Sequence, residues 1–209
     1  MNNKIEIYDL IIIGAGFAGL YSLHKAKLQN LKTIVIEKAS DVGGTWFWNR
    51  YPGARCDVES MQYSYQFSKD IEEQWEWTEQ YSTQPEILKY ANHVADKLNL
   101  RENINFNTEV ISAHFLEDSN MWKIIDNNNN ILNSKFCIMA TGCLSKIHQP
   151  NFKNLESYTG PIYHTGEWPH KNVNLKNKIV GVIGTGSSAI QTIPEIINDV
   201  KKLYVFQRT

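Results

Sequence analysis

Two short segments of the sequence place glycines where a nucleotide diphosphate could bind. The first, from Gly14 to Gly19, reads Gly-Ala-Gly-Phe-Ala-Gly, and the second, from Gly184 to Ala189, reads Gly-Thr-Gly-Ser-Ser-Ala. In this pattern the first glycine permits a tight turn, the second lets the backbone approach a diphosphate, and the third position lets a helix pack closely on a strand. Each segment therefore predicts a dinucleotide site.

The elements around the first motif are those that such a site requires. An apolar run ending at Ile13 predicts a buried parallel strand, and residues 17–29 predict a helix whose N-terminal N–H groups point at the diphosphate. A second strand, 33–36, ends at Glu37, whose carboxylate is placed to accept hydrogen bonds from a ribose diol. The alternative is a glycine-rich turn without a ligand, and the complete context favours the dinucleotide.

The second motif has the same context but a different ending. Residues 178–183 predict a strand, a helix follows to about Asn198, and 203–206 predict the next strand. Arg208 then stands where the first unit has Glu37. An arginine suits the 2′-phosphate of NADPH, whereas a carboxylate would repel it. The economical assignment is FAD at the first motif and NADPH at the second.

The segment between the motifs contains one unusual loop. Residues 41–57 fit no helical or strand periodicity and combine two tryptophans with several glycines. We expect this loop to fold over a flat ring system, with Arg55 and Asp57 as the charged groups beside the ring. The alternative is that its tryptophans only fill the core. Residues 70–81 predict a solvated element with its aromatic side chains turned inward, and a helix is predicted from Pro85 to about Leu98.

Several short strands should complete the first sheet. They are predicted at 104–106, 110–116, 121–125, 131–134 and 136–140, and the Asn127–Asn130 run predicts a hairpin turn, because asparagine tolerates left-handed backbone angles. The 136–140 strand would end at Thr141 and Gly142, beside the ligand crevice. The small antiparallel excursion would be an insert ahead of this last strand.

Composition limits the binding partners and the cellular location that we expect. A chain of 209 residues with a formal net charge of −1 gives no reason to expect nucleic acid or an anionic membrane as partner. The three cysteines have neither metal-site nor Cys-x-x-Cys spacing, and no apolar run approaches the ~20 residues of a membrane helix. We therefore expect no bound metal, no membrane association and a cytoplasmic location.

Between the motifs lies a signature that resembles a known family. The Baeyer–Villiger monooxygenases, which are class B flavoprotein monooxygenases, carry Phe-x-Gly-x-x-x-His-x-x-x-Trp-Pro/Asp in this linker. The chain matches it at Gly160, His164, Trp168 and Pro169, with Tyr158 in place of phenylalanine. The runs from Gly43 to Trp46 and from Tyr51 to Asp57 are similar to the same group, and the resemblance extends over all 209 residues.

This resemblance implies an α/β, Rossmann-like fold with two dinucleotide-binding regions. It divides the chain into an FAD-binding domain with a small antiparallel β insert (1–145), a linker (146–177) and the start of an NADP-binding domain (178–209). FAD contacts are implied at Gly14, Gly16, Gly19, Glu37, Thr45, Trp46, Asp57, Tyr63 and Val110. NADPH contacts are implied at Arg55, Asp57, Thr185, Gly186, Ser187, Ser188, Gln191, Arg208 and Thr209. Neighbouring residues complete the expected cofactor-binding set: Ala15, Phe17, Ala18, Lys38, Gly44, Ala140, Thr141 and Gly142.

The activity implied is a monooxygenation. An enzyme of this kind uses FAD, NADPH and O2 to insert one oxygen atom into a small ketone, giving an ester or lactone. Asp57 and Arg55 are the expected catalytic residues, with Asp57 orienting Arg55 or a downstream cation, whereas His164 is expected to be a hydrogen-bonded hinge residue. The alternatives are an N- or S-oxygenating flavin monooxygenase and a non-catalytic FAD- and NADP-binding fragment or subunit. A disulfide reductase would need a second redox cysteine near Cys56.

The resemblance also implies that further sequence completes both domains in the family. We therefore expect the 209-residue chain alone to bind FAD only partially, to dissolve poorly and to produce no ester unless the missing half is supplied in trans. The region 178–209 should be loosely held, and the strand edge at 203–206 should be prone to pair with another chain.

Overall fold

The computed structural model of the chain describes residues 6–208. It contains two compact units: Met1–Phe47 with Leu88–Ser145, and Trp48–Ile87 with Lys146–Thr209. We describe each unit by itself. The expected division into FAD-binding, linker and NADP-binding segments is a functional one and stays a prediction.

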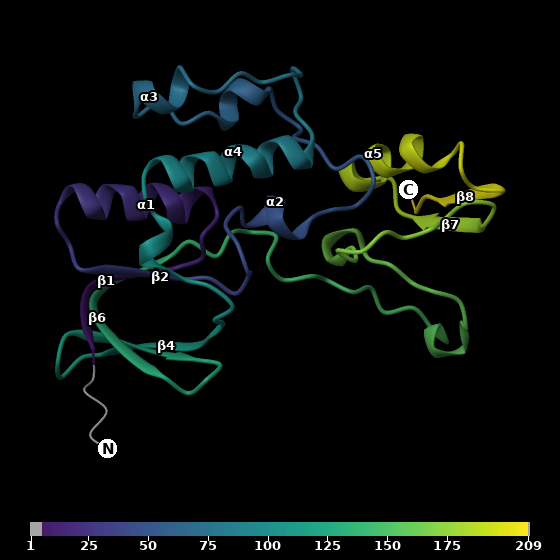
Figure 1. Ribbon diagram of the computed structural model, residues 1–209. Helices are drawn as coiled ribbons and strands as arrows, with labels where there is room; N and C mark the ends of the chain where they lie inside the picture. Colours follow the sequence, from purple (N-terminus) through teal and green to yellow (C-terminus); the bar gives the residue numbers. More distant parts are fainter. Residues whose placement is uncertain (1–5, 209) are drawn as a thin grey trace. The chain divides into compact units, whose positions relative to one another are not determined.

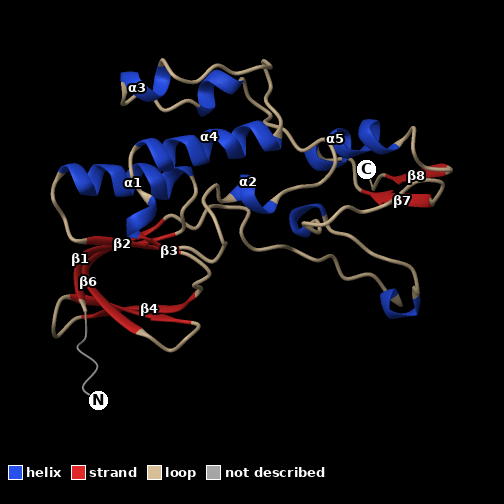
Figure 2. Ribbon diagram, viewed as in Figure 1, coloured by secondary structure: helices blue, strands red, loops and turns tan. Residues whose placement is uncertain are grey.

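The first unit is built on a six-stranded sheet with the order β3-β2-β1-β6-β5-β4 (Figures 1 and 2). Strands β3, β2, β1 and β6 are parallel, whereas β5 and β4 are antiparallel additions at one side. The strands are β1 (Ile7–Ile13), β2 (Thr33–Ile36), β3 (Ile104–Asn105), β4 (Val110–Leu116), β5 (Met121–Asp126) and β6 (Ile131–Met139). The fold is therefore Rossmann-like and α/β with a small antiparallel insert, as the sequence predicts.

Strand β6 differs from the prediction of two separate strands at 131–134 and 136–140. It runs unbroken from Ile131 to Met139. Its first four residues pair antiparallel with β5 on one side, while the strand also pairs parallel with β1 on the other. The insert and the central strand are thus one element, and Lys135, between the two predicted strands, forms an ion pair of 2.8 Å with Asp9 of β1.

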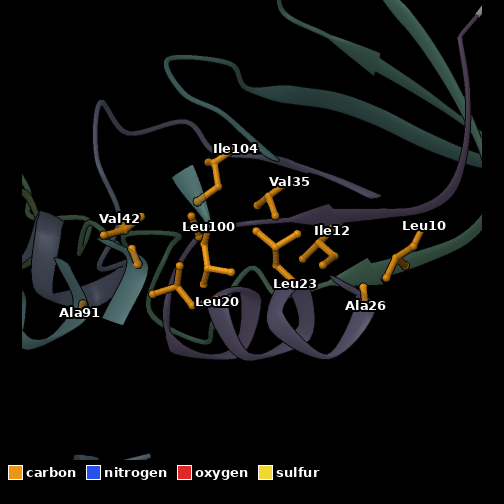
Figure 3. Packing of buried hydrophobic residues seen from close by; sticks show 12 residues of the cluster. Leu10, Ile12, Leu20, Leu23, Ala26, Val35, Val42, Ala91, Leu100 and Ile104 are labelled. Atoms are coloured by element: carbon orange, nitrogen blue, oxygen red, sulfur yellow. The ribbon is translucent and has the colours of Figure 1, made fainter. Parts of the chain in front are cut away.

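Two helices contribute buried side chains to an apolar cluster on one face of this sheet (Figure 3). They are α1 (Phe17–Leu28) and the part of α4 (Gln84–Lys97) that belongs to the first unit. Their buried side chains meet those of β1, β2 and β3 in one apolar cluster: Leu10, Ile12, Ala15, Leu20, Leu23, Ala26, Val35, Val42, Ala91, Ala95, Leu100 and Ile104. This burial removes apolar surface from water and holds the carboxyl ends of β1 and β2 in place.

The opposite face is covered by the antiparallel insert. Ile11, Ile36 and Ile124 form a second buried cluster, with Val110, Ala113, Trp122 and Leu132 packed against it. Here β4 and β5 occupy the face that a second helical layer covers in a doubly wound fold. The insert therefore helps to fix the strand that carries the first glycine motif.

The polyasparagine turn of the insert forms as predicted. Asn129 has a φ of +62°, in the left-handed region that asparagine tolerates. The Asp126 carboxylate, 2% exposed, accepts hydrogen bonds from the N–H groups of Asn128 (2.8 Å) and Asn130 (2.9 Å). It also accepts one from the Asn130 side chain at 2.9 Å.

The second unit contains the second glycine motif. Strands β7 (Ile179–Ile183) and β8 (Lys202–Phe206) pair in parallel, and α5 (Ser187–Ile196) connects them. The unit also contains α3 (Lys69–Glu72) and three short 3₁₀ segments, η1 (Ser60–Tyr63), η3 (Leu155–Ser157) and η4 (Thr165–Glu167). The four-residue helix α2 (Thr45–Trp48) interrupts the stretch predicted as a loop. Among residues 6–208, no helix is long and apolar enough to cross a membrane.

Candidate functional site

The first glycine motif forms a tight turn between β1 and α1. Gly14 has a φ of +104°, which disfavours side chains, and a Cβ there would lie 2.6 Å from the carbonyl oxygen of Ala140. Gly19 is packed more tightly, because its Cβ would lie 1.9 Å from the carbonyl oxygen of Gly14. The N-terminus of α1 has no side-chain cap, since its N-cap residue is Gly16. The backbone N–H groups at the start of α1 are therefore placed as an anion site requires.

Glu37 follows β2 and reaches the glycine turn. Its side chain is 5% exposed, and its oxygens accept hydrogen bonds from the N–H groups of Ala15 (2.5 Å) and Ala39 (2.7 Å). A carboxylate oxygen can accept a second hydrogen bond, so both oxygens retain capacity for a ribose diol. Glu37 therefore fits the predicted role and also ties the glycine turn to β2.

A third segment reaches this turn from residues 140–142. Gly14 contacts the backbone of Ala140, whose carbonyl carbon would lie 3.2 Å from a Cβ at Gly14, and Thr141 follows at 3.7 Å. These residues come directly after β6, which pairs with β1. The carboxyl ends of β1, β2 and β6 thus bring together the predicted residues of the first motif, Glu37, Ala140 and Thr141. Gly142 follows them and is exposed.

The remaining residues predicted in this unit are distributed around the same edge. Gly44 contacts Gly16, because a Cβ on Gly44 would lie 2.9 Å from the Gly16 Cα. Trp46 is 9% exposed, whereas Phe17, Thr45 and Val110 are half-buried. Ala18 and Lys38 are exposed, and Lys38 forms an ion pair with Glu109 at 2.8 Å.

The second glycine motif has the same local shape in more open surroundings. Gly184 has a φ of +105°, and α5 begins after Gly186 without a side-chain cap. A Cβ at either glycine would have no heavy atom within 4 Å. Thr185 and Ser187 are exposed, and Ser188 is half-buried. This N-terminus is therefore accessible to a diphosphate.

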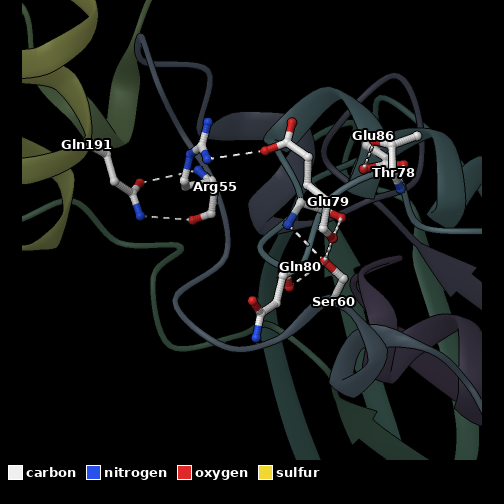
Figure 4. Close-up of polar contacts among 8 residues, drawn as sticks. Arg55, Ser60, Thr78, Glu79, Gln80, Glu86 and Gln191 are labelled. Carbon is white, nitrogen blue, oxygen red and sulfur yellow. Dashed lines mark hydrogen bonds and ion pairs between the residues drawn. The ribbon is translucent and has the colours of Figure 1, made fainter.

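Gln191 of α5 connects this motif to the loop that carries the predicted catalytic residues (Figure 4). Its Oε1 accepts hydrogen bonds from the Tyr51 hydroxyl (2.8 Å) and the Arg55 N–H (3.2 Å). Its Nε2 donates to the Arg55 carbonyl (3.1 Å) and to Asp57 Oδ1 (2.8 Å). Gly53 also packs on α5, since a Cβ there would lie 2.3 Å from the Gln191 carbonyl oxygen. The amide of Gln191 thus positions the 51–57 loop on α5.

Arg55 and Asp57 therefore lie together with Gln191 in the second unit. The Arg55 guanidinium also contacts Glu79 at 3.4 Å (Figure 4). The Asp57 side chain is exposed. Tyr63, in η1, is half-buried in the same unit. Arg208 is exposed after β8, and Thr209 lies outside the described residues. The predicted placement of Asp57 and Tyr63 beside the flavin stays a prediction.

His164 caps the short η4 segment. Its Nδ1 accepts a hydrogen bond of 3.1 Å from the Gly166 N–H. A ring nitrogen that accepts a hydrogen bond carries no proton, so in this contact the ring proton lies on Nε2. The contact agrees with the hypothesis of a hinge histidine.

The thiols do not form a redox pair in the part of the chain that the structure describes. Cys56, Cys137 and Cys143 are all free. Burial raises the pKa of Cys56 and of Cys137, which favours the thiol over the thiolate form of both. Residues 6–208 also contain no cluster of three or more His, Cys, Asp or Glu side chains that could hold a metal ion.

Two contacts at these sites are not predicted by any sequence pattern. Tyr51 bonds Gln191 across 140 residues of sequence, and Arg101 bonds Asp41 across 60. Both contacts join a loop to a distant element, so no local spacing predicts them. Asp41 and Tyr51 could have been suspected only because they lie in the glycine-rich segment.

Comparison with known proteins defines the class. Residues 11–209 match the family model described as pyridine nucleotide-disulphide oxidoreductase. Since this match covers nearly the whole chain, the chain belongs to this family.

Within the family, its relatives are flavin monooxygenases. It is 45% identical over 203 residues to a Baeyer–Villiger monooxygenase of Pseudooceanicola batsensis, which covers 97% of this chain and 37% of the relative. It is 42% identical to the phenazine N-monooxygenase PhzNO1 of Lysobacter antibioticus, over 100% of this chain and 39% of the relative. The chain thus spans about two fifths of the length of the curated relatives it matches.

Solved structures agree with the fold and the resemblance. The oxidized steroid monooxygenase bound to NADP matches with a TM-score of 0.92 and 49% identity, over 97% of this chain and 39% of that chain. OTEMO in complex with FAD and NADP matches with a TM-score of 0.92 and 41% identity, over 99% and 40%. The resemblance to Baeyer–Villiger and related flavin monooxygenases is therefore confirmed.

Proposed function

We propose that the chain forms the FAD-binding region and part of the NADPH-binding region of a monooxygenase that converts a ketone to an ester or lactone. The observation that carries this proposal is that the two glycine motifs are followed by opposite charges. The second strand of the first motif ends at the buried Glu37, and that of the second motif is followed by the exposed Arg208. A carboxylate suits a ribose diol and an arginine suits a 2′-phosphate. The similarity to a steroid monooxygenase bound to NADP and to OTEMO in complex with FAD and NADP supports the same assignment.

The residues of the first motif fit FAD. The uncapped N-terminus of α1 faces a turn in which Gly14, Gly16 and Gly44 carry no side chain, and Glu37 holds two acceptor oxygens beside it. FAD supplies the oxygen chemistry when bound, while the protein binds and orients the cofactor and excludes water. In the second unit, Gln191 holds the backbone of Arg55 and the carboxylate of Asp57 against α5. This loop would orient the nicotinamide nucleotide.

The overall reaction balances with one nucleotide and one O2. NADPH supplies two electrons, one oxygen atom enters the bond beside the carbonyl, and the other oxygen leaves as water with two protons. Substrate choice depends on the rest of such an enzyme. Cytoplasmic location and the supply of a missing half in trans are further hypotheses of this proposal.

The second candidate is N-oxygenation. It is favoured by the 42% identity to the phenazine N-monooxygenase over the whole chain. Trp168 and Pro169 match the Baeyer–Villiger signature instead, which is why ketone oxidation is the first choice.

A chimera tests both candidates. Residues 1–209 would replace the matching segment of the Pseudooceanicola relative, and FAD content, NADPH and NADH oxidation, and products from ketones and N-heterocycles would be measured by absorbance and mass spectrometry. We expect stoichiometric FAD, preference for NADPH and ketone-dependent ester. A chimera that binds FAD and forms only N-oxide would favour the second candidate. Bound FAD that NADPH cannot reduce would indicate a binding role without catalysis.

A matched variant checks the first motif in the 209-residue chain. A Cβ at Gly16 would already lie 3.4 Å from the Gly44 Cα, so Gly16→Val would place its methyl groups in the path of the diphosphate. We expect a folded variant that has lost FAD. Retention of the FAD content of the wild-type chain would show that the cofactor is bound elsewhere.

A further inference from the structure

A second segment, residues 41–44, lies against the first glycine turn, and we call it the 41–44 loop. Its Gly44 contacts Gly16 through the backbone, since a Cβ on Gly44 would lie 2.9 Å from the Gly16 Cα. Gly16 is the residue at which the diphosphate approaches the N-terminus of α1. The position of Gly44 therefore sets how much space the diphosphate has.

The two glycines of the 41–44 loop have no side chains with which to hold this position. Gly43 and Gly44 have φ of +123° and +54°, and neither has a side chain to pack. Glycine loses more conformational freedom on ordering than any other residue. On one side the loop is held by the hydrogen bond from Gly43 N–H to the Ala15 carbonyl, at 3.1 Å, and by the fully buried Val42. The carbonyls of Gly43 and Gly44 also accept hydrogen bonds from the N–H groups of Trp46 (3.1 Å) and Phe47 (3.0 Å).

Arg101 holds the loop from the other side. Its Nη1 donates to Asp41 Oδ1 at 2.7 Å, and the same oxygen accepts the Val42 N–H at 2.7 Å. Its Nε and Nη2 donate to Asp96 and Asn92, both on α4. Burial lowers the pKa of Arg101, but the bonds to Asp41 and Asp96 outweigh it and the pKa is raised, so the guanidinium stays charged.

These contacts use the planar fork of the guanidinium. Three different N–H groups bond three partners, two on α4 and one in the 41–44 loop, so the position of Asp41 is fixed relative to the helix. Lysine carries a point charge on a flexible stem and cannot hold three partners in one plane. The side chains of Arg101 and Asp41 are 36% and 38% exposed, so the contact depends on geometry as well as on charge.

We propose that Arg101 is a positioning residue for FAD: through Asp41 it holds Gly44 against Gly16 and so maintains the space in which the diphosphate approaches Gly16. This inference rests on the proposed function, in which the first motif binds FAD. Arg101 acts through Asp41 and the 41–44 loop, so its loss should weaken ligands that contain the diphosphate.

The test compares Arg101 with Lys27 in the 209-residue chain. Lys27 of α1 donates to the Asn99 carbonyl (2.7 Å), Glu102 (2.8 Å) and Asn103 (3.1 Å). These partners flank Arg101 in sequence, and none of the partners that the structure describes for Lys27 lies in the 41–44 loop. Lys27→Met therefore removes a comparable polar contact from the same region without releasing the loop.

Dissociation constants for FAD and for ADP would be measured by fluorescence and calorimetry, well below the melting temperature of each variant. We expect Arg101→Met and Asp41→Asn each to weaken both ligands about tenfold, which corresponds to about 1.4 kcal/mol. Arg101→Lys should recover only part of the affinity. Lys27→Met should bind both ligands as wild type does, whatever its melting temperature.

Each outcome decides between the proposals. If wild type binds no FAD, the proposed function fails. If wild type binds FAD and Arg101→Met or Asp41→Asn binds it equally well, the positioning role is wrong. Equal losses in Lys27→Met and Arg101→Met would show that general destabilisation explains the effect, which also overturns the inference. Should Arg101→Met fail to fold, Asp41→Asn decides alone.

Discussion

The turns after β1 and after β7 have nearly the same backbone, because Gly14 and Gly184 have φ of +104° and +105° and both helices begin after an uncapped glycine. Their surroundings differ. A Cβ at Gly14 would meet the Ala140 carbonyl at 2.6 Å, whereas one at Gly184 would meet nothing within 4 Å. The local sequence therefore determines the shape of the turn, and the rest of the sheet determines how tightly it is packed.

The two turns differ in packing because the strands before them have different neighbours in their sheets. β1 pairs with β2 on one side and β6 on the other, and Ile11 and Ile12 are fully buried. β7 pairs with β8 in a two-stranded sheet, and Ile179 and Ile183 are 65% and 66% exposed. Substitutions in the first motif should thus act on stability and cofactor together, whereas those in the second should act mainly on the nucleotide.

The largest expected effect is that of Gly19→Ala. Its Cβ would lie 1.9 Å from the Gly14 carbonyl oxygen, so backbone atoms must move. Overpacking of this kind costs about 1–3 kcal/mol and more where the backbone is displaced. Ala189→Gly, at the matching position of the second motif, should cost about 1 kcal/mol, the usual difference between alanine and glycine in a helix. Urea unfolding followed by circular dichroism measures both, and similar losses would contradict the comparison.

The sequence predicts the first unit well because its signals are local. The glycine turn, the helix 17–29, the strand 33–36 and the asparagine turn all depend on neighbouring residues, and the structure has them at or within a residue of the expected positions. The sequence does not predict that β6 is one unbroken strand. Its periodicity indicates two strands, but pairing with β5 on one side and β1 on the other makes them continuous.

The site was predictable to a smaller degree. Glu37 and residues 140–142 follow from strand ends that a parallel sheet must bring together. The bonds of Gln191 to the 51–57 loop and of Arg101 to Asp41 join residues 60 to 140 positions apart, and no spacing rule reaches that far. The short helix α2 inside the predicted loop was missed as well, since four residues are too few for a periodic pattern.

Glu37→Gln should have the next largest effect. The carboxylate accepts the Ala15 and Ala39 N–H groups, and an amide can accept with only one of its two ends. Losing a buried hydrogen bond to a charged group costs about 1.5–3 kcal/mol. Arg208→Gln is the matched variant in the second unit, and because Arg208 is exposed we expect no measurable change in unfolding free energy. Equal unfolding midpoints for the two variants would contradict the conclusion that the first motif is packed more tightly than the second.

The insert provides a smaller effect that depends on pH. Burial alone would raise the pKa of Asp126, but bonds from the Asn130 side chain and from the N–H groups of Asn130 and Asn128 outweigh it, so the pKa is lowered. A lowered pKa in the folded state gives stability that is present above the unfolded value, about 3.9, and is lost as pH falls through the folded value.

Asp126→Asn should therefore cost about 1 kcal/mol at pH 7 and progressively less below pH 4. Urea midpoints at pH 7, 5 and 3.5 give the difference at each pH. Hydrogen exchange would show whether the loss is confined to the first unit, with β7 and α5 unchanged. A pH-independent difference would rule out the carboxylate as its source.

Gly186→Ala should have the smallest effect on stability. Gly186 has an ordinary φ of −76°, which alanine adopts without strain, and its Cβ would point into open space. We expect the unfolding free energy to change by less than about 0.5 kcal/mol. The same open space is where the diphosphate of NADPH would approach α5, so the methyl group should weaken NADPH binding while FAD binding remains as in wild type.

Gly16→Ala is the matched variant in the first motif, where the new Cβ would lie 3.4 Å from the Gly44 Cα. It should weaken FAD and lower the melting temperature more than Gly186→Ala does, since its methyl group contacts the 41–44 loop at the short limit of ordinary van der Waals distance. Calorimetric titration of NADPH and FAD against both variants separates the effects. If Gly186→Ala lowered the melting temperature as much as Gly16→Ala, the second turn would be packed as tightly as the first, and the difference in sheet neighbours would not explain how the two motifs behave.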